Sequence, residues 1–248
     1  MTQRYKVTIE YDGSSYCGFQ KQFGIVEKSV EEVLEEAVFK MSQERTKIVV
    51  CGRTDAGVHA LGQVAHFDLG KKFSHRQIIL GLNSYLRQEN VTILNCELVD
   101  ENFHARFKAK MRHYRYVIVN RCAPLVLQKN RAWHVAPNLD ILAMQAAAKF
   151  LIGEHDFSSF RDAECQGKSP IKSLKKIEIT QNNEEILIEV SAPSFLHHMV
   201  RNIVGTLVWV GSKKIESLEM KKILEAKDRT KSGPNAPAVG LYFLRADY

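Results

Sequence analysis

The chain of 248 residues is 45% hydrophobic and carries 35 lysines and arginines against 28 aspartates and glutamates, so its net charge is +7. It is long enough to bury a sizeable core, it opens without a leader-like pattern, and no apolar stretch reaches the roughly 18 residues of a membrane helix, so we expect a soluble protein. Its five cysteines are odd in number and widely spaced, which excludes a disulfide framework and a paired-cysteine metal site and favours reduced thiols in the cytoplasm.

The first half of the chain predicts a strand, a helix and a second strand. Residues 5–11 alternate in polarity and end at DGSS, which is typical of a strand followed by a turn. Ser29 is placed to cap a helix that has glutamates in its first turn. The apolar residues of this helix recur at helical spacing on one face: Val30, Leu34, Val38 and Met41. Residues 47–52 (KIVVCG) then predict a buried strand.

A similar order of elements begins again after residue 110. Residues 112–120 (RHYRYVIVN) predict a strand, and residues 139–153 predict a helix that Asn138 caps and Gly153 ends. The repeated order indicates two related α+β lobes, residues 1–107 and residues 108–248.

The end of the chain predicts a hairpin and a helix. KKIEIT and EEILIEVSA are typical of two strands that turn at residues 181–183. FLHHMVRNIVGTLVWVG, residues 195–211, is typical of a long apolar helix. We expect His197 and His198 to lie on this helix, where neighbouring side chains point about 100° apart and cannot readily chelate one ion. These histidines, like His59 and His66, are therefore interpreted as core or groove residues.

The loop CGRTDAGVHA contains the first candidate for chemistry. Asp55 stands between Arg53 and Gly57, where a glycine allows close backbone approach and an arginine favours an ionised carboxylate. The same pattern is typical of an Asx-turn or a salt-bridge partner. No second acidic residue follows within a few positions, so the loop predicts no metal site.

Residues 103–116 (FHARFKAKMRHYRY) interleave basic and aromatic side chains. Cations suit phosphates and rings suit unstacked bases, so this pattern predicts contact with single-stranded or looped RNA. An exposed strand with snorkelling side chains has the same pattern. A later lysine-rich loop, ECQGKSPIKSLKK, adds positive charge and is also typical of a solvated loop.

Several segments occur in the order and at about the spacing of the tRNA pseudouridine synthase A family: CGRTDAGVHALGQVAHF, FHARF, YRY, CQGKSPIK, FLHHMVRNIVGTL and AVGLYF. This resemblance implies an α+β fold of two RRM-like lobes around a largely antiparallel sheet. It implies a cytoplasmic homodimer that needs no cofactor and no metal. The implied reaction is isomerisation of uridine to pseudouridine at positions 38, 39 and 40 of the tRNA anticodon stem-loop.

The resemblance also implies roles for single residues. Asp55 matches the family's catalytic aspartate, acting either as a nucleophile at C1′ or as a base towards a glycal-like intermediate. Tyr114 matches a tyrosine that stacks on the target base and assists loss of the C5 proton, and Arg201 matches the partner of the aspartate. Arg53 matches the arginine that fills the space left by the flipped uridine. The implied RNA contacts are Phe103, His104, Ala105, Arg106, Phe107, Cys165, Gln166, Gly167 and Lys168.

Two alternatives fit parts of the pattern. A non-catalytic RNA-binding module would carry the same basic and aromatic residues but would not need Asp55 and Arg201 together. A pseudouridine synthase acting on another RNA would share the aspartate, although FHARF and HHMVRN disfavour it.

Overall fold

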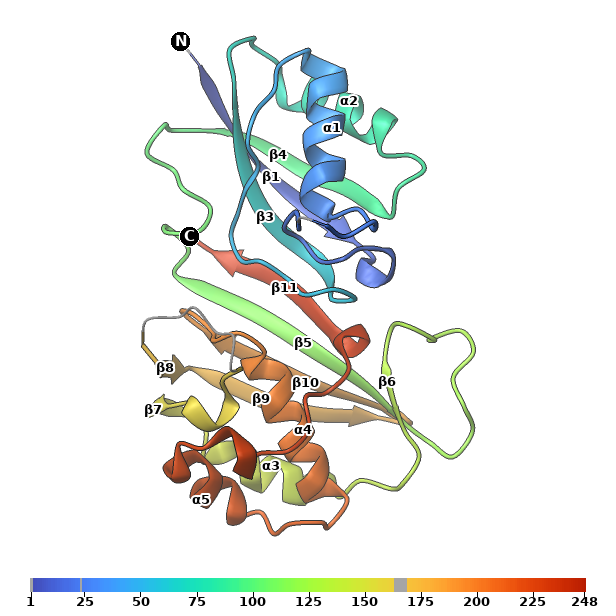
Figure 1. Cartoon of the computed structure of the whole chain (residues 1–248), viewed down its shortest axis with the longest axis vertical. Coiled ribbons are helices and arrows are strands. Elements are labelled where there is room, and N and C mark those ends of the chain that lie inside the picture. The colour runs from blue at the N-terminus through green and yellow to red at the C-terminus, as the bar shows by residue number, and fades with distance from the viewer. Residues whose placement is uncertain (1, 23, 163–168) are drawn as a thin grey trace. The chain divides into compact units, whose positions relative to one another are not determined.

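The computed structural model describes residues 2–22, 24–162 and 169–248 and divides the chain into two compact units (Figure 1). Unit 1 comprises the residues up to Lys110 together with Tyr242–Tyr248, and unit 2 comprises Met111–Leu241. The sequence prediction assigned residues 108–248 to one lobe, whereas Tyr242–Tyr248 belong to unit 1.

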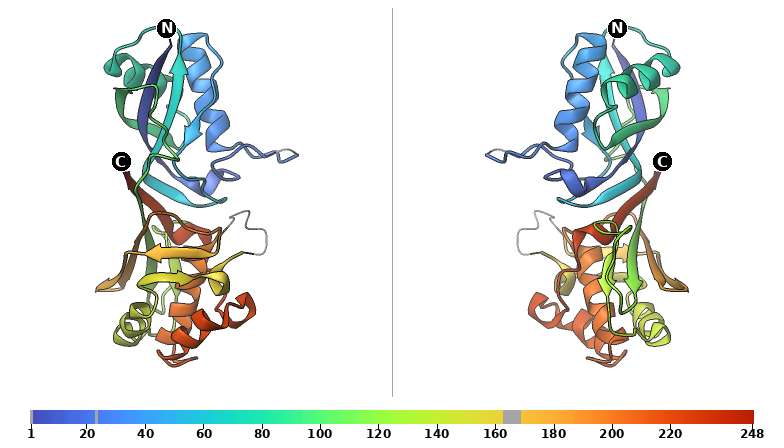
Figure 2. Two further views of the ribbon diagram at one scale, coloured as in Figure 1. Left: turned by 90° about the vertical axis from the view of Figure 1, so that its left-hand side faces the viewer. Right: turned by 90° about the vertical axis from the view of Figure 1, so that its right-hand side faces the viewer.

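Unit 1 is a sheet in the order β4-β1-β3-β11 with two helices (Figures 1 and 2). Its elements are β1 (Gln3–Tyr11), the 3-10 turn Gly13–Ser15, α1 (Val30–Ser42), β2 (Val49–Val50), β3 (His59–Leu69), α2 (His75–Tyr85), β4 (Val91–Val99) and β11 (Leu241–Asp247). Strand β1 pairs antiparallel with β3 and β4, β2 pairs antiparallel with β3, and β11 pairs parallel with β3. Helix α2 packs on β4 and against α1.

The first helix begins where the sequence predicts. Ser29 accepts a hydrogen bond from the backbone N–H of Glu32 at 3.2 Å, and the Glu32 carboxylate accepts one from the Ser29 N–H at 3.0 Å. This reciprocal capping box satisfies two amides that a helix start leaves unpaired. Val30, Leu34 and Val38 are buried, as their spacing predicts, while Met41 is half-buried.

Unit 2 is a sheet in the order β5-β10-β9 with β6 beside β5, and a separate pair β7-β8. Its elements are β5 (Met111–Asn120), β6 (Trp133–Val135), α3 (Ile141–Lys149), β7 (Gly153–Asp156), β8 (Ile171–Leu174), β9 (Lys176–Asn182), β10 (Glu185–Ala192), α4 (Met199–Gly211), α5 (Glu219–Ala226) and the 3-10 turns Ser158–Phe160, Arg229–Lys231 and Ala238–Gly240. Helix α3 packs against α4, α5 and β9. Most strand pairs in both units are antiparallel, which confirms the predicted α+β class.

Helix α3 differs from its prediction at both ends. Its N-cap is Asp140, which accepts from Ala143 N–H at 3.0 Å, and not Asn138. The residues just before the helix bind to other parts of unit 2 and cannot continue it: the Leu139 N–H donates to the Asn120 side chain, and the Asp140 N–H donates to the Gly211 carbonyl. The helix ends at Lys149, and Gly153 opens β7 instead.

Helix α4 begins at Met199, so His197 and His198 precede it and do not lie on it as predicted. His198 is the N-cap and has φ +59°, a left-handed conformation that interrupts helical geometry. The two imidazole rings consequently stack, with centroids 3.8 Å apart and planes 28° apart.

The described residues also bear on membrane-spanning helices and on the cysteines. No helix among the described residues is both long and apolar enough to cross a membrane. Cys17, Cys96 and Cys122 are free thiols in this part of the chain.

Candidate active site

Asp55 lies in the loop between β2 and β3, which is held by backbone contact with the chain after the first strand. Gly18 forms an antiparallel bridge with Asp55, and the Phe19 N–H donates to the Thr54 carbonyl at 2.9 Å. Gly18 has φ +116°, and a Cβ there would lie 2.9 Å from the Thr54 carbonyl oxygen. Only glycine fits this position without displacing the chain beside Asp55.

A buried set of polar side chains supports the loop from beneath. The hydroxyls of Tyr11 and Thr54 are 2.7 Å apart, and the Gln63 amide donates to the Gly52 carbonyl at 2.9 Å. Burial raises the pKa of Tyr11 to about 12, so this phenol stays protonated and keeps its hydrogen bond to Thr54. The Asp55 side chain itself is half-buried, and Arg53, two residues earlier, is exposed.

The loop turns back into β3 through Gly57, at φ +79°, and the Val58 N–H donates to the Asp55 carbonyl at 3.2 Å. His59 then accepts from the Gly13 N–H at 3.1 Å and stacks on Tyr242 with centroids 4.7 Å apart. His59 is 2% exposed, which confirms its interpretation as a core residue. The predicted strand 47–52 is shortened to β2 because the chain leaves it to form this loop.

In unit 2, Tyr114 and Tyr116 lie on β5 but have different surroundings. Tyr114 is half-buried and meets the Phe195 ring edge-on, with centroids 5.1 Å apart. Tyr116 is fully buried and donates its hydroxyl to the Pro237 carbonyl at 2.6 Å. Burial raises the pKa of Tyr116 well above its usual value. Tyr116 is therefore committed to the core, which agrees with choosing Tyr114 for the site.

Arg201 lies in the first turn of α4 and is held by the segment Gly233–Ala236. Its Nε donates to the Ala236 carbonyl at 2.8 Å, and the Ala236 N–H donates back to the Arg201 carbonyl at 3.2 Å. The segment fits against the helix because position 205 is glycine: a Cβ there would lie 1.8 Å from the Pro234 carbonyl oxygen. A Thr206 hydroxyl also accepts from the Gly233 N–H at 2.9 Å.

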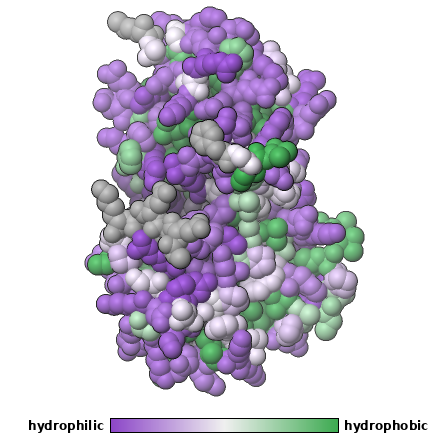
Figure 3. Space-filling model, in the orientation of Figure 1, coloured by the Kyte–Doolittle hydropathy of each residue, from purple (hydrophilic) through white to green (hydrophobic). Residues whose placement is uncertain are grey.

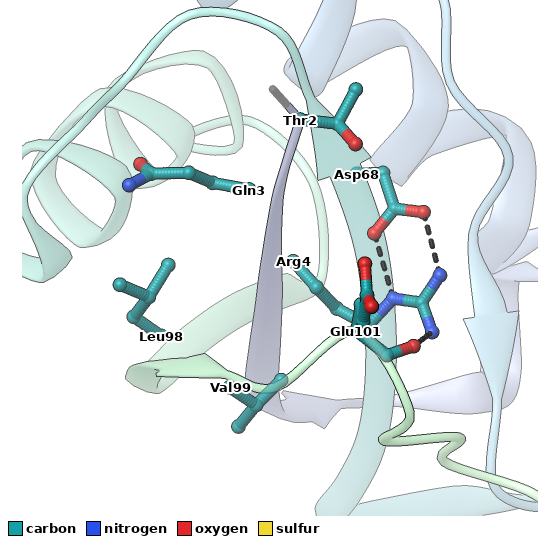
Figure 4. A pocket seen from close by; sticks show the side chains of 7 residues that line it. All are labelled: Thr2, Gln3, Arg4, Asp68, Leu98, Val99 and Glu101. Atoms are coloured by element: carbon teal, nitrogen blue, oxygen red, sulfur yellow. Dashed lines mark hydrogen bonds and ion pairs between the residues drawn. The ribbon is translucent and has the colours of Figure 1, made fainter.

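The predicted RNA-contact residues 103–107 form a turn anchored to the sheet of unit 1. Arg4 makes two hydrogen bonds to the Asp68 carboxylate, both 2.7 Å, which lower the pKa of Asp68, and it donates to the Glu101 carbonyl (Figure 4). Arg4 also donates to the Phe103 carbonyl at 2.8 Å. A small pocket of about 160 Å³ lies around Arg4. The guanidinium that lines it already binds Asp68 and two backbone carbonyls, so its role here is structural.

The middle of the turn is also fixed. Ala105 is 0% exposed, its N–H donates to His66 Nδ1 at 3.2 Å, and its carbonyl accepts from the Tyr248 hydroxyl at 2.8 Å. Burial lowers the pKa of His66 to about 4, so this histidine stays neutral and keeps Nδ1 as an acceptor. Like His59, it is a core residue, as predicted.

The predicted contacts in this turn differ in exposure. Arg106 is exposed and Phe107 is 76% exposed, whereas Phe103 is half-buried with its ring centroid 5.0 Å from that of Tyr248. His104 Nδ1 accepts from the N–H groups of Arg106 and Phe107, so it shapes the turn from within. Cys165, Gln166, Gly167 and Lys168 lie outside the described residues.

The sequence did not single out several residues that shape these sites: Tyr11, Gly18, Gln63 and Phe195. Their partners are far along the chain, so no local spacing reveals them. Gly18 within SYCGFQ offered the only local signal, a glycine followed by an aromatic residue after a turn.

Comparison with known proteins identifies the family. A family profile described as tRNA pseudouridine synthase matches residues 7–108 and 147–248. The tRNA pseudouridine synthase A of Ehrlichia canis (strain Jake) is 50% identical over 99% of this chain and 100% of its own length. That of Ehrlichia chaffeensis (strain ATCC CRL-10679 / Arkansas) is 49% identical with the same coverage. A solved structure of an unknown protein from Galdieria sulphuraria covers 82% of this chain and 88% of its own at 14% identity, and its TM-score of 0.24 is too low to add to this. The chain belongs to the tRNA pseudouridine synthase family.

Proposed function

We propose that this chain isomerises uridine to pseudouridine at positions 38, 39 and 40 of the tRNA anticodon stem-loop. The C1′–N1 bond breaks, a C1′–C5 bond forms, C5 loses a proton and N1 gains one. Atoms and electrons balance within the base and sugar, so the reaction needs no redox cofactor.

The observation that carries the proposal is the way the Asp55 loop is built. Backbone bonds from Gly18 and Phe19 and the buried Tyr11–Thr54 pair hold this half-buried aspartate in one place. A carboxylate that attacks C1′ or removes a sugar proton must be placed within a fraction of an ångström, and such support supplies that placement. Asp55 is the proposed catalytic residue.

Three other residues have supporting roles in the proposed reaction. Tyr114 stacks on the flipped base and assists loss of the C5 proton, and Arg201 has the role that the family resemblance implies, as the partner of the catalytic aspartate. Arg53, exposed beside Asp55, enters the space that the flipped uridine leaves and offsets part of the unstacking cost.

RNA contact is assigned to the turn 103–107, with Arg106 and Phe107 as its exposed members. Cys165, Gln166, Gly167 and Lys168 remain proposed contacts from the family resemblance. The net charge of +7 suits a polyanionic substrate, and phosphate contacts make affinity depend on salt.

We also propose that the protein is cytoplasmic and acts as a homodimer. In unit 2, the chain before β6 exposes 76% of Val126 and 92% of Leu127, beside a groove of about 390 Å³ that includes Trp133. Figure 3 shows hydrophobic surface at the right-hand edge, where Figure 1 draws this part of the chain. Light scattering of the wild type and of Leu127→Glu tests this: a dimer that becomes monomeric supports the assignment, and a monomeric wild type contradicts it.

The activity is tested by tritium release from anticodon stem-loop RNA labelled with 5-³H-uridine, with carbodiimide mapping of the modified position. We expect release from substrates with uridine at 38, 39 or 40 and none from Asp55→Asn. Binding without release by the wild type would instead support the RNA-binding module. Modification only of a different RNA would support the other alternative.

A further inference from the structure

A second group of titratable side chains lies in unit 2 next to Arg201. His198 Nδ1 is 2.6 Å from the Asp162 carboxylate, and the His197 ring stacks on the His198 ring. His198 is the N-cap of α4 and Arg201 lies three residues later in the first turn, so both belong to the same end of the helix.

The backbone of His198 is held in an uncommon conformation. Its φ of +59° lies in the left-handed region, which residues other than glycine rarely adopt and which is enriched at functional sites. The His198 carbonyl accepts from the Asn202 N–H at 2.9 Å, and the His197 carbonyl accepts from the Asp162 N–H at 3.2 Å. These bonds fix the chain on both sides of the imidazole.

Asp162 also determines which nitrogen of His198 carries the hydrogen. An ionised carboxylate only accepts, so at 2.6 Å it requires a hydrogen on Nδ1. In the neutral ring Nε2 then carries the lone pair, and the carboxylate stabilises the imidazolium that forms when Nε2 takes up a proton. The Asn235 amide nitrogen also lies 3.2 Å from Nδ1, but because Nδ1 carries the hydrogen that faces Asp162, it does not donate a hydrogen bond to this atom. Asn235 precedes the Ala236 that binds Arg201.

Tyr114 contacts the same short segment. Its ring meets that of Phe195, which lies three residues before His198. A neutral phenol relays a proton only when a base accepts its own proton in turn. The residues around Tyr114 therefore need to include such a base if its hydroxyl assists at C5.

We propose that His198 is this base, with Asp162 as its positioning residue. The inference rests on the proposed function. After C1′ is joined to C5, the C5–H bond breaks, its electron pair restores the C5–C6 double bond, and the proton passes through the Tyr114 hydroxyl to Nε2. The imidazolium returns a proton to N1 or to water, so no other reactant is consumed.

The test compares single-turnover rates on stem-loops carrying 5-¹H-uridine or 5-²H-uridine. We expect His198→Gln to slow the reaction by about 10²-fold at unchanged RNA affinity, in line with the effect of losing a general base. Removal of the base makes C5–H cleavage rate-limiting, so the variant should acquire a primary isotope effect that a purely structural defect does not produce. Asp162→Asn should show a smaller loss of the same kind.

His197→Gln is the matched control, since it changes the stacked neighbour and should stay near the wild-type rate. His198→Gly guards against misfolding, because glycine accepts the left-handed backbone and leaves space for added imidazole, which should restore part of the rate. A fast His198→Gln, or a slow one with neither an isotope effect nor imidazole rescue of His198→Gly, overturns the inference. The proposed function fails separately, if the wild type itself forms no pseudouridine.

Discussion

The two units hold their candidate site residues in different ways. In unit 1, the Asp55 loop is fixed mainly by backbone bonds, the Gly18 bridge and the Phe19–Thr54 hydrogen bond. In unit 2, Tyr114 and Arg201 are placed by a ring contact and by a guanidinium bond to a carbonyl. Backbone support tolerates most side-chain changes but depends on its glycine, whereas the candidate residues of unit 2 also depend on contacts of their own side chains.

The largest expected effect comes from Asp55 itself. Asp55→Asn keeps the shape and the backbone support of the loop and removes only the charge, so folding and RNA affinity should stay near wild type while turnover is lost. Single-turnover assays and thermal melts measure the two properties. Residual turnover above about a tenth of wild type would exclude the assigned role, because a group that attacks C1′ or removes the sugar proton cannot be dispensable.

Gly18→Ala tests whether the backbone bridge places the aspartate. The new Cβ meets the Thr54 carbonyl at 2.9 Å, and a shift of about 1 Å in a catalytic group can cost about 10²-fold in rate. The control is Gly24→Ala, where φ is also positive, +80°, but no atom lies within 4 Å of the new Cβ. Equal losses of rate in both variants would show that backbone strain, and not contact with the Asp55 loop, is responsible.

The difference between local patterns and contacts between distant residues explains what the sequence could predict. The helix cap at Ser29 and the alternation of the first strand are local patterns, and the structure confirms them. The family motifs also identified Asp55, Tyr114 and Arg201 as candidates. The left-handed His198 was not predictable, because the apolar run from Phe195 to Gly211 has helical character throughout and nothing in it marks an interruption.

Long-range support was equally invisible in the sequence. Gly18 bridges to Asp55, and the last strand pairs with β3, from which it is separated by more than half of the chain. Neither pairing produces a periodic pattern in the sequence. The cap of α3 moved to Asp140 because distant partners hold the residues before it. Local propensity alone could not choose between Asn138 and Asp140, two good capping residues two positions apart.

A third test concerns the two tyrosines of β5. Tyr114→Phe keeps the ring and the Phe195 contact but removes the hydroxyl, so we expect normal RNA affinity and a rate about 10²-fold lower. Tyr116→Phe leaves the Pro237 carbonyl without its buried donor and should lower the free energy of unfolding by about 1–2 kcal/mol with little change in rate. A larger loss of rate in Tyr116→Phe would reverse the assignment.

Acid should weaken unit 1 through His66. Its pKa of about 4 in the folded chain lies below the ordinary value of 6.5, so the unfolded chain binds protons more strongly as pH falls through this window. Stability present above pH 6.5 is then lost, by up to about 2 kcal/mol at pH 5. His66→Asn keeps an acceptor for the Ala105 N–H without a titrating ring. Urea unfolding at pH 7 and pH 5 should show a smaller pH effect in this variant, and an equal effect would contradict the argument.

The smallest expected effect separates contact from support within the turn 103–107. Phe107 is 76% exposed, so Phe107→Ala should leave the melting temperature unchanged but weaken RNA binding about tenfold, since stacking of a base on an aromatic ring contributes about 1–3 kcal/mol. Phe107→Tyr should bind normally because it keeps the ring. Arg106→Gln should reduce the salt dependence of binding by about one phosphate contact. Leu142→Ala is the matched control for Phe107→Ala, because Leu142 is an apolar side chain of similar exposure, 78%, on α3, and this variant should bind like wild type. If Phe107→Ala and Leu142→Ala bind RNA equally well, the Phe107 ring does not contact RNA, and the turn contributes charge alone.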